Sequence, residues 1–349
     1  MVRLAVIPGD GIGPEVAAEA LPLLEWARSR GRDLAWDLQP WGAERFLATG
    51  EALPDEAFEA IRDGHDAVLF GAVGDPRIPD NRHAEAILLR LRQELELAVN
   101  YRPCFPAADA LVPLKSVKAG DIRIEVFREN TEGPYCLRGR SGDGFAVDEA
   151  HHSGPAVERL LEAAFARAEA ARRPLTLAHK ANVLKHGHGL WMRRFQACRA
   201  AHPAVEASAL HADALLCALV QRPSAFGIIA GDNFIGDLVS DLTAAFMGGM
   251  GLAPSLSYAP HKPFRCSALT EPVHGSAPDL AGMGKANPGG MILSAALLFR
   301  HLGWEEEAAA IEASVTSALR AGAATADLGG SLTTAEMGAA LRANLAGLR

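Results

Sequence analysis

The stretch VRLAVIPGDGIGPEV, residues 2–16, decides how the beginning of the chain folds. An apolar run leads into glycines at positions 9, 11 and 13, and Pro14 follows directly. Such a run before a glycine-rich turn is typical of a buried strand, and proline suits a first helical position because its missing N–H would have no partner there. The stretch therefore predicts a strand, a tight turn and a helix that runs from Pro14 toward Gly31.

The same glycines raise the alternative of a phosphate-binding turn for a dinucleotide. That fingerprint needs a further glycine three residues after the second, where helix and strand pack with no side chain between them. Pro14 occupies this position. We therefore interpret the turn as structural and do not expect a Rossmann fold.

Short apolar runs alternate with helical patterns along the rest of the chain. The runs cover 66–73, 122–128, 175–180 and 226–231, and the helical patterns cover 156–172, 236–247 and 288–301. This alternation is typical of an α/β protein with a largely parallel sheet. We expect Asn287 to be the N-cap of the last helix and Pro288 to be its first residue.

Composition limits the kinds of partner that the chain is expected to have. Its 349 residues are enough for two domains or one large α/β unit, and the net charge of −8 argues against a nucleic-acid surface. The five cysteines are scattered and form no CxxC pair, which favours a reducing compartment. No stretch approaches the ~18 apolar residues of a membrane span, and no leader precedes the first strand. We expect a soluble, cytoplasmic protein without nucleic-acid or membrane partners.

Carboxylates in two segments suggest a metal site. Asp237 and Asp241 lie four residues apart on an expected helix and so share one face, although ordinary solvated helices carry such pairs too. Asp213 follows a strand-like run and adds a third carboxylate. Ligands that are all oxygen suit Mg²⁺ or Mn²⁺.

Arginines and one lysine supply the positive charge that a polycarboxylate ligand needs. The candidates are Arg90, Arg92, Arg102 and Arg128, any of which could equally be a salt-bridged surface arginine. Arg90 and Arg92 are two residues apart, so on a helix only one of them can point into a given site. Arginines that converge would imply a ligand with several carboxylates. Lys180 ends an apolar run, where a lysine is usually solvated but could act as a base beside a metal. In the glycine-rich turn that follows, His186 and His188 are more often structural than a metal pair.

The segment EPVHGSAPDLAGMGKANPGG, residues 271–290, is the last candidate. Its glycine, proline and alanine content leaves backbone N–H groups available for an adenine or a diphosphate. It could equally be an inert connection.

Together these motifs make the chain resemble, over nearly its whole length, the β-decarboxylating dehydrogenases that act on 3-substituted malates. The matching segments, in family order, are GDGIGPEV, LLRLR, NYRP, REN with TEGPY, HKANVL, the aspartate before ALLCALV, GDNFIGDLVSD, and EPVHGSAPD with ANP. The resemblance implies a fold of the isocitrate/isopropylmalate dehydrogenase type, with two α/β domains around a cleft. Residues 1–98 and 250–349 would form the cofactor-binding domain. Residues 99–249 would form the substrate, metal and dimerisation domain with a clasping arm.

The resemblance also implies a role for each matching residue. The catalytic pair would be Tyr135 and Lys180; the substrate would meet Arg92, Arg102, Arg128, Leu88 and Glu85; Mg²⁺ or Mn²⁺ would meet Asp213, Asp237 and Asp241; and NAD would meet His274, Gly275, Ser276, Ala277, Asp279, Asn287 and Asn182. Lys180 would take the hydroxyl proton as hydride leaves for NAD, and Tyr135 would protonate the carbon that loses CO₂. The enzyme would be a homodimer in which Lys180 and Asp213 reach the neighbouring site.

Two further expectations concern specificity. The substrate's 3-substituent would face residues 85–89, where Ile87 and Leu88 offer only hydrocarbon, so an alkyl group is expected there. Asp279 would accept hydrogen bonds from the adenosine ribose and disfavour NADP. The alternatives are a relative that acts on isocitrate, homoisocitrate, tartrate or malate, and a non-catalytic regulatory subunit.

Overall fold

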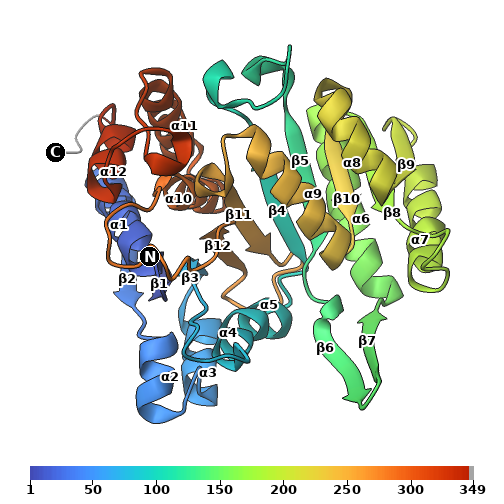
Figure 1. Cartoon of the computed structure of the whole chain (residues 1–349), viewed down its shortest axis with the longest axis horizontal. Helices are drawn as coiled ribbons and strands as arrows, with labels where there is room; N and C mark the ends of the chain where they lie inside the picture. The colour runs from blue at the N-terminus through green and yellow to red at the C-terminus, as the bar shows by residue number, and fades with distance from the viewer. Residues whose placement is uncertain (346–349) are drawn as a thin grey trace.

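The computed structural model describes residues 1–345, in which helices cover both faces of one long sheet and a hairpin stands apart (Figure 1). The strands are β1 (Val2–Gly9), β2 (Leu34–Leu38), β3 (Ala67–Ala72), β4 (Val99–Cys104), β5 (Ile124–Glu129), β6 (Gly133–Gly142), β7 (Phe145–His151), β8 (Leu175–His179), β9 (Ala207–His211), β10 (Ile228–Gly231), β11 (Pro254–Tyr258) and β12 (Ala268–Pro272). The α-helices are α1 (Gly13–Ser29), α2 (Ala43–Thr49), α3 (Asp55–Gly64), α4 (Arg82–Ala84), α5 (Arg90–Glu94), α6 (Gly154–Ala171), α7 (Gly187–Ala201), α8 (Ala212–Gln221), α9 (Asn233–Phe246), α10 (Gly289–His301), α11 (Glu305–Arg320) and α12 (Thr334–Arg342).

Ten strands pair in the order β2-β1-β3-β12-β11-β4-β5-β10-β8-β9. The outer pairs on both sides are parallel, as the alternating sequence pattern predicts. In the middle, β11 is antiparallel to both β12 and β4, and β4 is antiparallel to β5. The sheet is therefore mixed at its centre, which the alternation of strands and helices did not predict.

The opening segment folds as the sequence predicts. β1 ends in the turn, and α1 begins at Gly13 with Pro14 in its first turn. Gly9 and Gly11 have φ values of 71° and 57°, and a Cβ on them would lie 1.8 Å from the Ala72 carbonyl oxygen and 1.9 Å from the Ser276 carbonyl oxygen. The glycines are needed because the turn contacts β3 and the 271–290 loop directly.

The buried apolar side chains form four clusters, two around each half of the sheet. Two clusters draw mainly on residues 4–97 and 252–345, on the side of β1, β3 and β12. The other two draw mainly on residues 99–247, around β5, β8 and β10. This distribution agrees with two domains made from the segments named above, whose boundaries stay a prediction.

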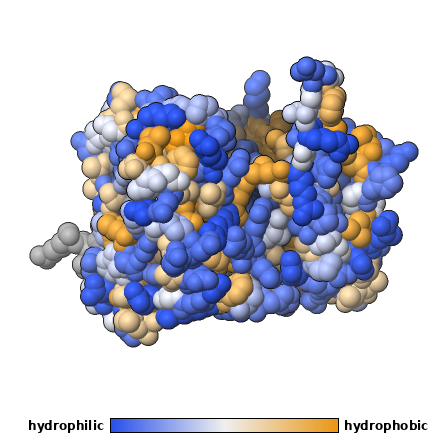
Figure 2. Space-filling model, turned by 90° about the horizontal axis from the view of Figure 1, so that it is seen from below, coloured by the Kyte–Doolittle hydropathy of each residue, from blue (hydrophilic) through white to orange (hydrophobic). Residues whose placement is uncertain are grey.

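The hairpin β6–β7 forms a separate two-stranded antiparallel sheet that projects from the body of the molecule (Figure 1). Leu137 and Phe145 on this hairpin are 58% and 55% exposed. Viewed from below, hydrophilic residues predominate on the surface and hydrophobic residues form separate groups (Figure 2). None of the described helices has the length and apolar character needed to cross a bilayer.

Two local predictions were wrong. Helix α10 begins at Gly289, so Pro288 is its N-cap and Asn287 lies one residue earlier, although the Asn287 side chain still accepts the Gly289 N–H at 2.9 Å. Residues 85–89 form a π-helical turn ahead of α5, and Ile87 there is fully buried in the core beside α3. Ile87 therefore cannot face a substrate.

Candidate active site

Helix α9 presents two carboxylates on one face. Its N-cap is Asp232, whose side chain accepts the Ile235 N–H at 2.7 Å and so fixes the start of the helix. One turn apart farther along, Asp237 and Asp241 lie 3.1 and 3.4 Å from the same guanidinium nitrogen, Nη1 of Arg102. The predicted pair therefore converges on one place.

Two buried arginines on adjacent strands meet these carboxylates. Arg102 on β4 also donates to Asn100 at 2.7 Å, and Arg128 on β5 forms an ion pair with Asp237 and donates to the Asn233 carbonyl at 2.8 Å. Burial and the nearby Arg102 lower the pKa of Arg128 to about 10, so it stays charged at neutral pH. These contacts orient both guanidinium groups toward α9.

Tyr135 completes this group. Its hydroxyl donates to Oδ2 of Asp237 at 2.9 Å, and its ring lies 5.0 Å from the Arg128 guanidinium carbon. Burial raises the pKa of Tyr135 above its ordinary value of 10, so the hydroxyl keeps its proton at neutral pH. A side chain in this state can act as a proton donor.

The donor set at α9 fits a hard divalent cation. Burial opposes ionisation of Asp237, but Arg128 and Arg102 outweigh it and lower its pKa; burial and the charge of Asp237 raise the pKa of Asp241. A cation between the two carboxylates would relieve that repulsion, and carboxylate oxygens are the ligands that Mg²⁺ and Mn²⁺ prefer.

Arg92 approaches from the other half of the sheet. It pairs with Glu271 at 2.6 Å, and both side chains are buried. Its Nε is also buried and has no hydrogen-bond partner among residues 1–345, so this N–H is available to a ligand. The next residue, Gln93, donates to the Tyr135 carbonyl at 3.0 Å, so α5 contacts the site. Before it, Leu88 is half-buried and Glu85 is exposed.

Lys180 and Asp213 form a second group. The Lys180 ammonium lies 2.8 Å from Oδ2 of Asp213, whose side chain is 70% exposed. Asn182, in the turn after Lys180, is exposed as well. Within the described part of the chain, no hydrogen bond or ion pair joins Asp213 to Asp237 or Asp241. A single chain thus holds the predicted residues in two groups.

A buried histidine connects these groups indirectly. Nδ1 of His188 accepts the backbone N–H of Lys180 at 2.9 Å, so the ring proton sits on Nε2, which lies 3.0 Å from Oδ2 of Asp232. His152, Nδ1 of which accepts the Trp191 N–H at 3.2 Å, completes a group with ligand atoms within 4.8 Å of one another. A metal would need the nitrogen lone pairs that these protons occupy, so the geometry favours a hydrogen-bonded cluster.

Six of the seven predicted cofactor residues, all except Asn182, lie on the loop that contacts the opening turn. Ser276 accepts the Ile12 N–H at 2.8 Å through its carbonyl, and Asn287 donates to Asp327 at 3.1 Å. The buried Nε2 of His274 has no partner among residues 1–345, and burial lowers the pKa of His274, so the ring is neutral near pH 7. Gly275 and Asp279 are exposed, and Ala277 has a φ of 38°. An unpaired imidazole nitrogen and exposed loop backbone suit a nucleotide.

Sequence reasoning missed several residues that orient the site. Glu271, Asp232, His188, Asn100 and Asn233 each contact a predicted site residue or fix the helix that carries one. Asp232 had a usable signal, since an aspartate just before a helical pattern is a typical N-cap. Glu271 and Asn233 contact arginines that are 179 and 105 positions away in the sequence, so they had no local signal.

The chain belongs to the isocitrate/isopropylmalate dehydrogenase family, because the model of that family matches residues 3–341. It is therefore an oxidoreductase of the dehydrogenase class. Among the relatives, a protein of Beutenbergia cavernae named 3-isopropylmalate dehydrogenase is 44% identical over 358 residues, with 99% of each chain covered. A protein of Thermobifida fusca with the same name is 44% identical over 91% of each chain.

The solved structures agree with the predicted fold. The crystal structure of isocitrate dehydrogenase from Methylococcus capsulatus matches with a TM-score of 0.88 and 31% identity, and the match covers 99% of both chains. The predicted fold class is therefore confirmed.

Proposed function

We propose that this chain catalyses the oxidative decarboxylation of 3-isopropylmalate to 2-oxo-4-methylpentanoate and CO₂, a step of leucine biosynthesis, with NAD and Mg²⁺ or Mn²⁺. The observation that carries the proposal is the convergence of Tyr135, Arg102 and Arg128 on Asp237. It joins a proton donor, two carboxylate-binding groups and a carboxylate suited to a metal. The curated relatives at 42–44% identity support the choice of substrate.

Different residues of the chain bind the substrate and transfer the protons. Arg92, Arg102 and Arg128 bind the substrate carboxylates, and Lys180 takes the proton of the substrate hydroxyl. When bound, NAD accepts the hydride and the divalent cation stabilises the enolate oxygen that develops as CO₂ leaves. Tyr135 then donates its hydroxyl proton to the carbon that carried the lost carboxylate.

We expect the substrate's alkyl group to lie beside residues 85–89, where Leu88 is half-buried and Glu85 is exposed. Burial of a branched alkyl group against hydrocarbon is worth ~1.5–3 kcal/mol, which favours isopropylmalate over substrates with a polar 3-substituent.

The assembly that supports this chemistry is a homodimer. Exposed apolar side chains lie on the hairpin and on α8 and α9, and they include Phe145, Val220, Phe234 and Leu238. Exposed apolar surface of this kind is typical of subunit interfaces. A dimer through these elements would bring the partner subunit's Lys180 and the partner subunit's Asp213 to Asp237 and Asp241.

The test is an assay of NADH formation by the full chain after removal of metal with EDTA. We expect activity only after Mg²⁺ or Mn²⁺ is restored, with 3-isopropylmalate giving a higher kcat/KM than isocitrate, homoisocitrate, tartrate or malate. Asp241→Asn should raise the metal concentration needed for half-maximal activity, whereas Asp33→Asn, at a side chain that is 77% exposed, should not. A higher kcat/KM with one of the other substrates would contradict the proposed substrate. If none of the five compounds gave NADH, the chain would instead be a regulatory subunit.

A further inference from the structure

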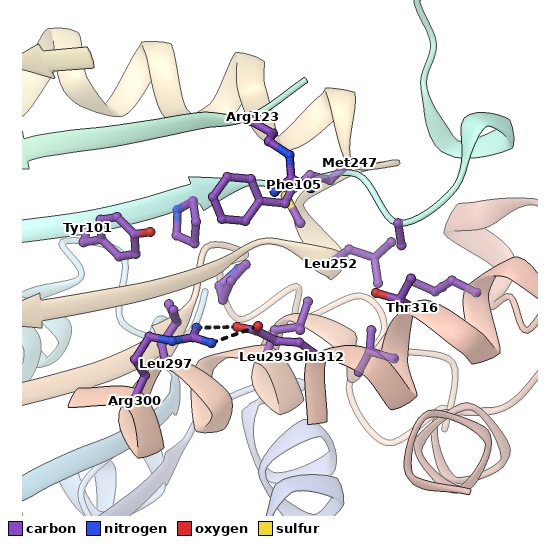
Figure 3. Close-up of a pocket in the computed structure, with 15 residues that line it drawn as sticks. Tyr101, Phe105, Arg123, Met247, Leu252, Leu293, Leu297, Arg300, Glu312 and Thr316 are labelled. Atoms are coloured by element: carbon purple, nitrogen blue, oxygen red, sulfur yellow. Dashed lines mark hydrogen bonds and ion pairs between the residues drawn. The ribbon is translucent and has the colours of Figure 1, made fainter. Parts of the chain in front are cut away.

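A cavity of about 290 Å³ lies beside β4 (Figure 3). Side chains alternate along a strand, so Arg102 points to α9 while its neighbour Tyr101 lines the cavity. The other walls come from β11, α10 and α11. The cavity is therefore separate from the residues assigned to catalysis.

Most of the lining is hydrocarbon. The apolar residues are Pro103, Phe105, Ala107, Met247, Leu252, Pro254, Leu293, Leu297, Val315 and Leu319. Small-molecule sites are mostly apolar cavities of about 300–1,000 Å³ with a few polar groups that orient the ligand. This cavity is at the lower end of that range, so its ligand must be small.

Most polar groups of the lining already have partners. The Tyr101 hydroxyl donates to Glu125 at 2.9 Å, and Arg300 holds both carboxylate oxygens of Glu312, at 2.5 and 3.0 Å (Figure 3). Glu125 also pairs with Arg167 at 2.7 Å, and Arg300 also pairs with Glu305 at 3.1 Å, so these charged groups are already engaged. They fix the walls of the cavity.

Arg123 differs from these groups. Its guanidinium carbon lies 5.8 Å from the centre of the Phe105 ring, and among residues 1–345 no carboxylate forms an ion pair with it. Arg123 is exposed, so its positive charge at the edge of the apolar cavity is open to a ligand. A planar guanidinium binds a carboxylate through two hydrogen bonds.

We propose that this cavity binds a small apolar monocarboxylate, with the hydrocarbon chain between Leu252, Leu293 and Leu297 and the carboxylate on Arg123. The size of the cavity limits the chain to a few carbons. The binding site does not depend on the reaction catalysed at α9, and its test reads binding alone.

Isothermal titration calorimetry of the full chain with hexanoate, hexan-1-ol and hexylamine tests this proposal. Hexanoate should bind and the other two should bind at least about 10-fold more weakly, because they lack the charge that Arg123 pairs with. Arg123→Gln should weaken hexanoate binding by about 10-fold or more. Arg199→Gln, at an exposed arginine on α7, should leave it unchanged.

The candidate active site also contains arginines, so Arg102→Gln serves as a second comparison. Hexanoate affinity should survive this change. Loss of affinity in Arg102→Gln but not in Arg123→Gln would overturn the proposal, as would the absence of any binding up to about 10 mM hexanoate. Thermal unfolding of each variant shows that it is folded before it is titrated.

Discussion

His188 lies 3.0 Å from Asp232, and this buried contact ties the segment of Lys180 to the helix that carries Asp237 and Asp241. Nδ1 of His188 accepts the Lys180 N–H, Nε2 donates to Asp232, and Asp232 caps α9. Each step is a hydrogen bond with a fixed direction. His188 is therefore a positioning residue for two parts of the proposed machinery.

Replacement of His188 tests this role. His188→Ala leaves the Lys180 N–H and one oxygen of Asp232 unsatisfied, so the free energy of unfolding should fall by about 2–5 kcal/mol. In the fraction that remains folded, kcat should fall and the metal concentration for half-maximal activity should rise, because α9 loses its anchor. Gln in His188→Gln can still accept one hydrogen bond and donate another. This variant should therefore recover part of the lost kcat and part of the lost metal affinity.

His186→Ala is the matched control, because His186 is exposed two residues away. His186→Ala should change the free energy of unfolding by less than about 0.5 kcal/mol and should leave activity unchanged. If His188→Ala lowered stability but left kcat and the metal dependence as they are, the histidine would have only a structural role.

Shared active sites should be detectable by mixing two inactive variants. Lys180→Ala keeps Tyr135, and Tyr135→Phe keeps Lys180, so a heterodimer holds one complete site and one site that lacks both groups. Random exchange makes half of the dimers heterodimers, so activity should return to roughly one quarter of the wild-type value. Measurement of NADH formation before and after verified exchange checks this.

A homodimer whose sites are each complete within one subunit would give no recovery. The contact of Lys180 with Asp213 at 2.8 Å, apart from Asp237, is the observation that makes recovery the expected result.

We expect cofactor choice to depend on Asp279. This side chain is exposed on the 271–290 loop, and no cation within residues 1–345 pairs with it; Lys285 is exposed and also unpaired. A 2′-phosphate ~4 Å from the carboxylate would cost about 1 kcal/mol in water and about 4 kcal/mol at an effective dielectric of 20. NAD should therefore be preferred over NADP by roughly ten-fold to a thousand-fold in kcat/KM.

Asp279→Lys should move the preference toward NADP, while Lys285→Gln tests whether the nearby cation weakens the repulsion. Equal kcat/KM values for both cofactors in the unmodified enzyme would show that Asp279 does not face the ribose.

The sequence predicted individual strands better than it predicted which side chains contact one another. β3, β8 and β10 are short buried apolar runs, and such runs are visible without knowledge of their neighbours. The pairs Arg102 with Asp237 and Arg92 with Glu271 join residues 135 and 179 positions apart. Local patterns identify the charges, but only the packed sheet determines which charges meet.

The prediction that Ile87 faces the substrate was wrong because the direction of a side chain around a helix is hard to predict from sequence. An apolar residue near an expected site can face either the ligand or the core, and periodicity over five residues does not separate these cases. The π-helical turn at residues 85–89 also changes the direction of side chains relative to a regular α-helix. Leu88 is half-buried and packs against the same core cluster in which Ile87 is fully buried.

A stability prediction with a defined pH dependence comes from Glu307, which is far from the candidate active site. Its side chain is 2% exposed and accepts hydrogen bonds from Arg32 at 2.7 Å and from Arg30 at 3.3 Å. The hydrogen bond from Arg32 outweighs burial and lowers the pKa of Glu307 below its ordinary value of 4.5. The folded state therefore binds this proton more weakly than the unfolded state does.

Glu307→Gln should lower the free energy of unfolding by about 1–3 kcal/mol at pH 7, because it removes the charge that both arginines contact. Since the folded pKa is depressed, this contribution is complete above the ordinary pKa of 4.5, which the unfolded state has, and is lost as the pH falls from there toward the folded value. Urea unfolding of wild type and variant should thus give curves that converge below about pH 4. Glu306→Gln, at a side chain that is 83% exposed and 3.9 Å from Arg30, should change stability little at any pH. A Glu307→Gln difference that stays constant from pH 7 to about pH 3 would show that shape, and not charge, is what Glu307 contributes.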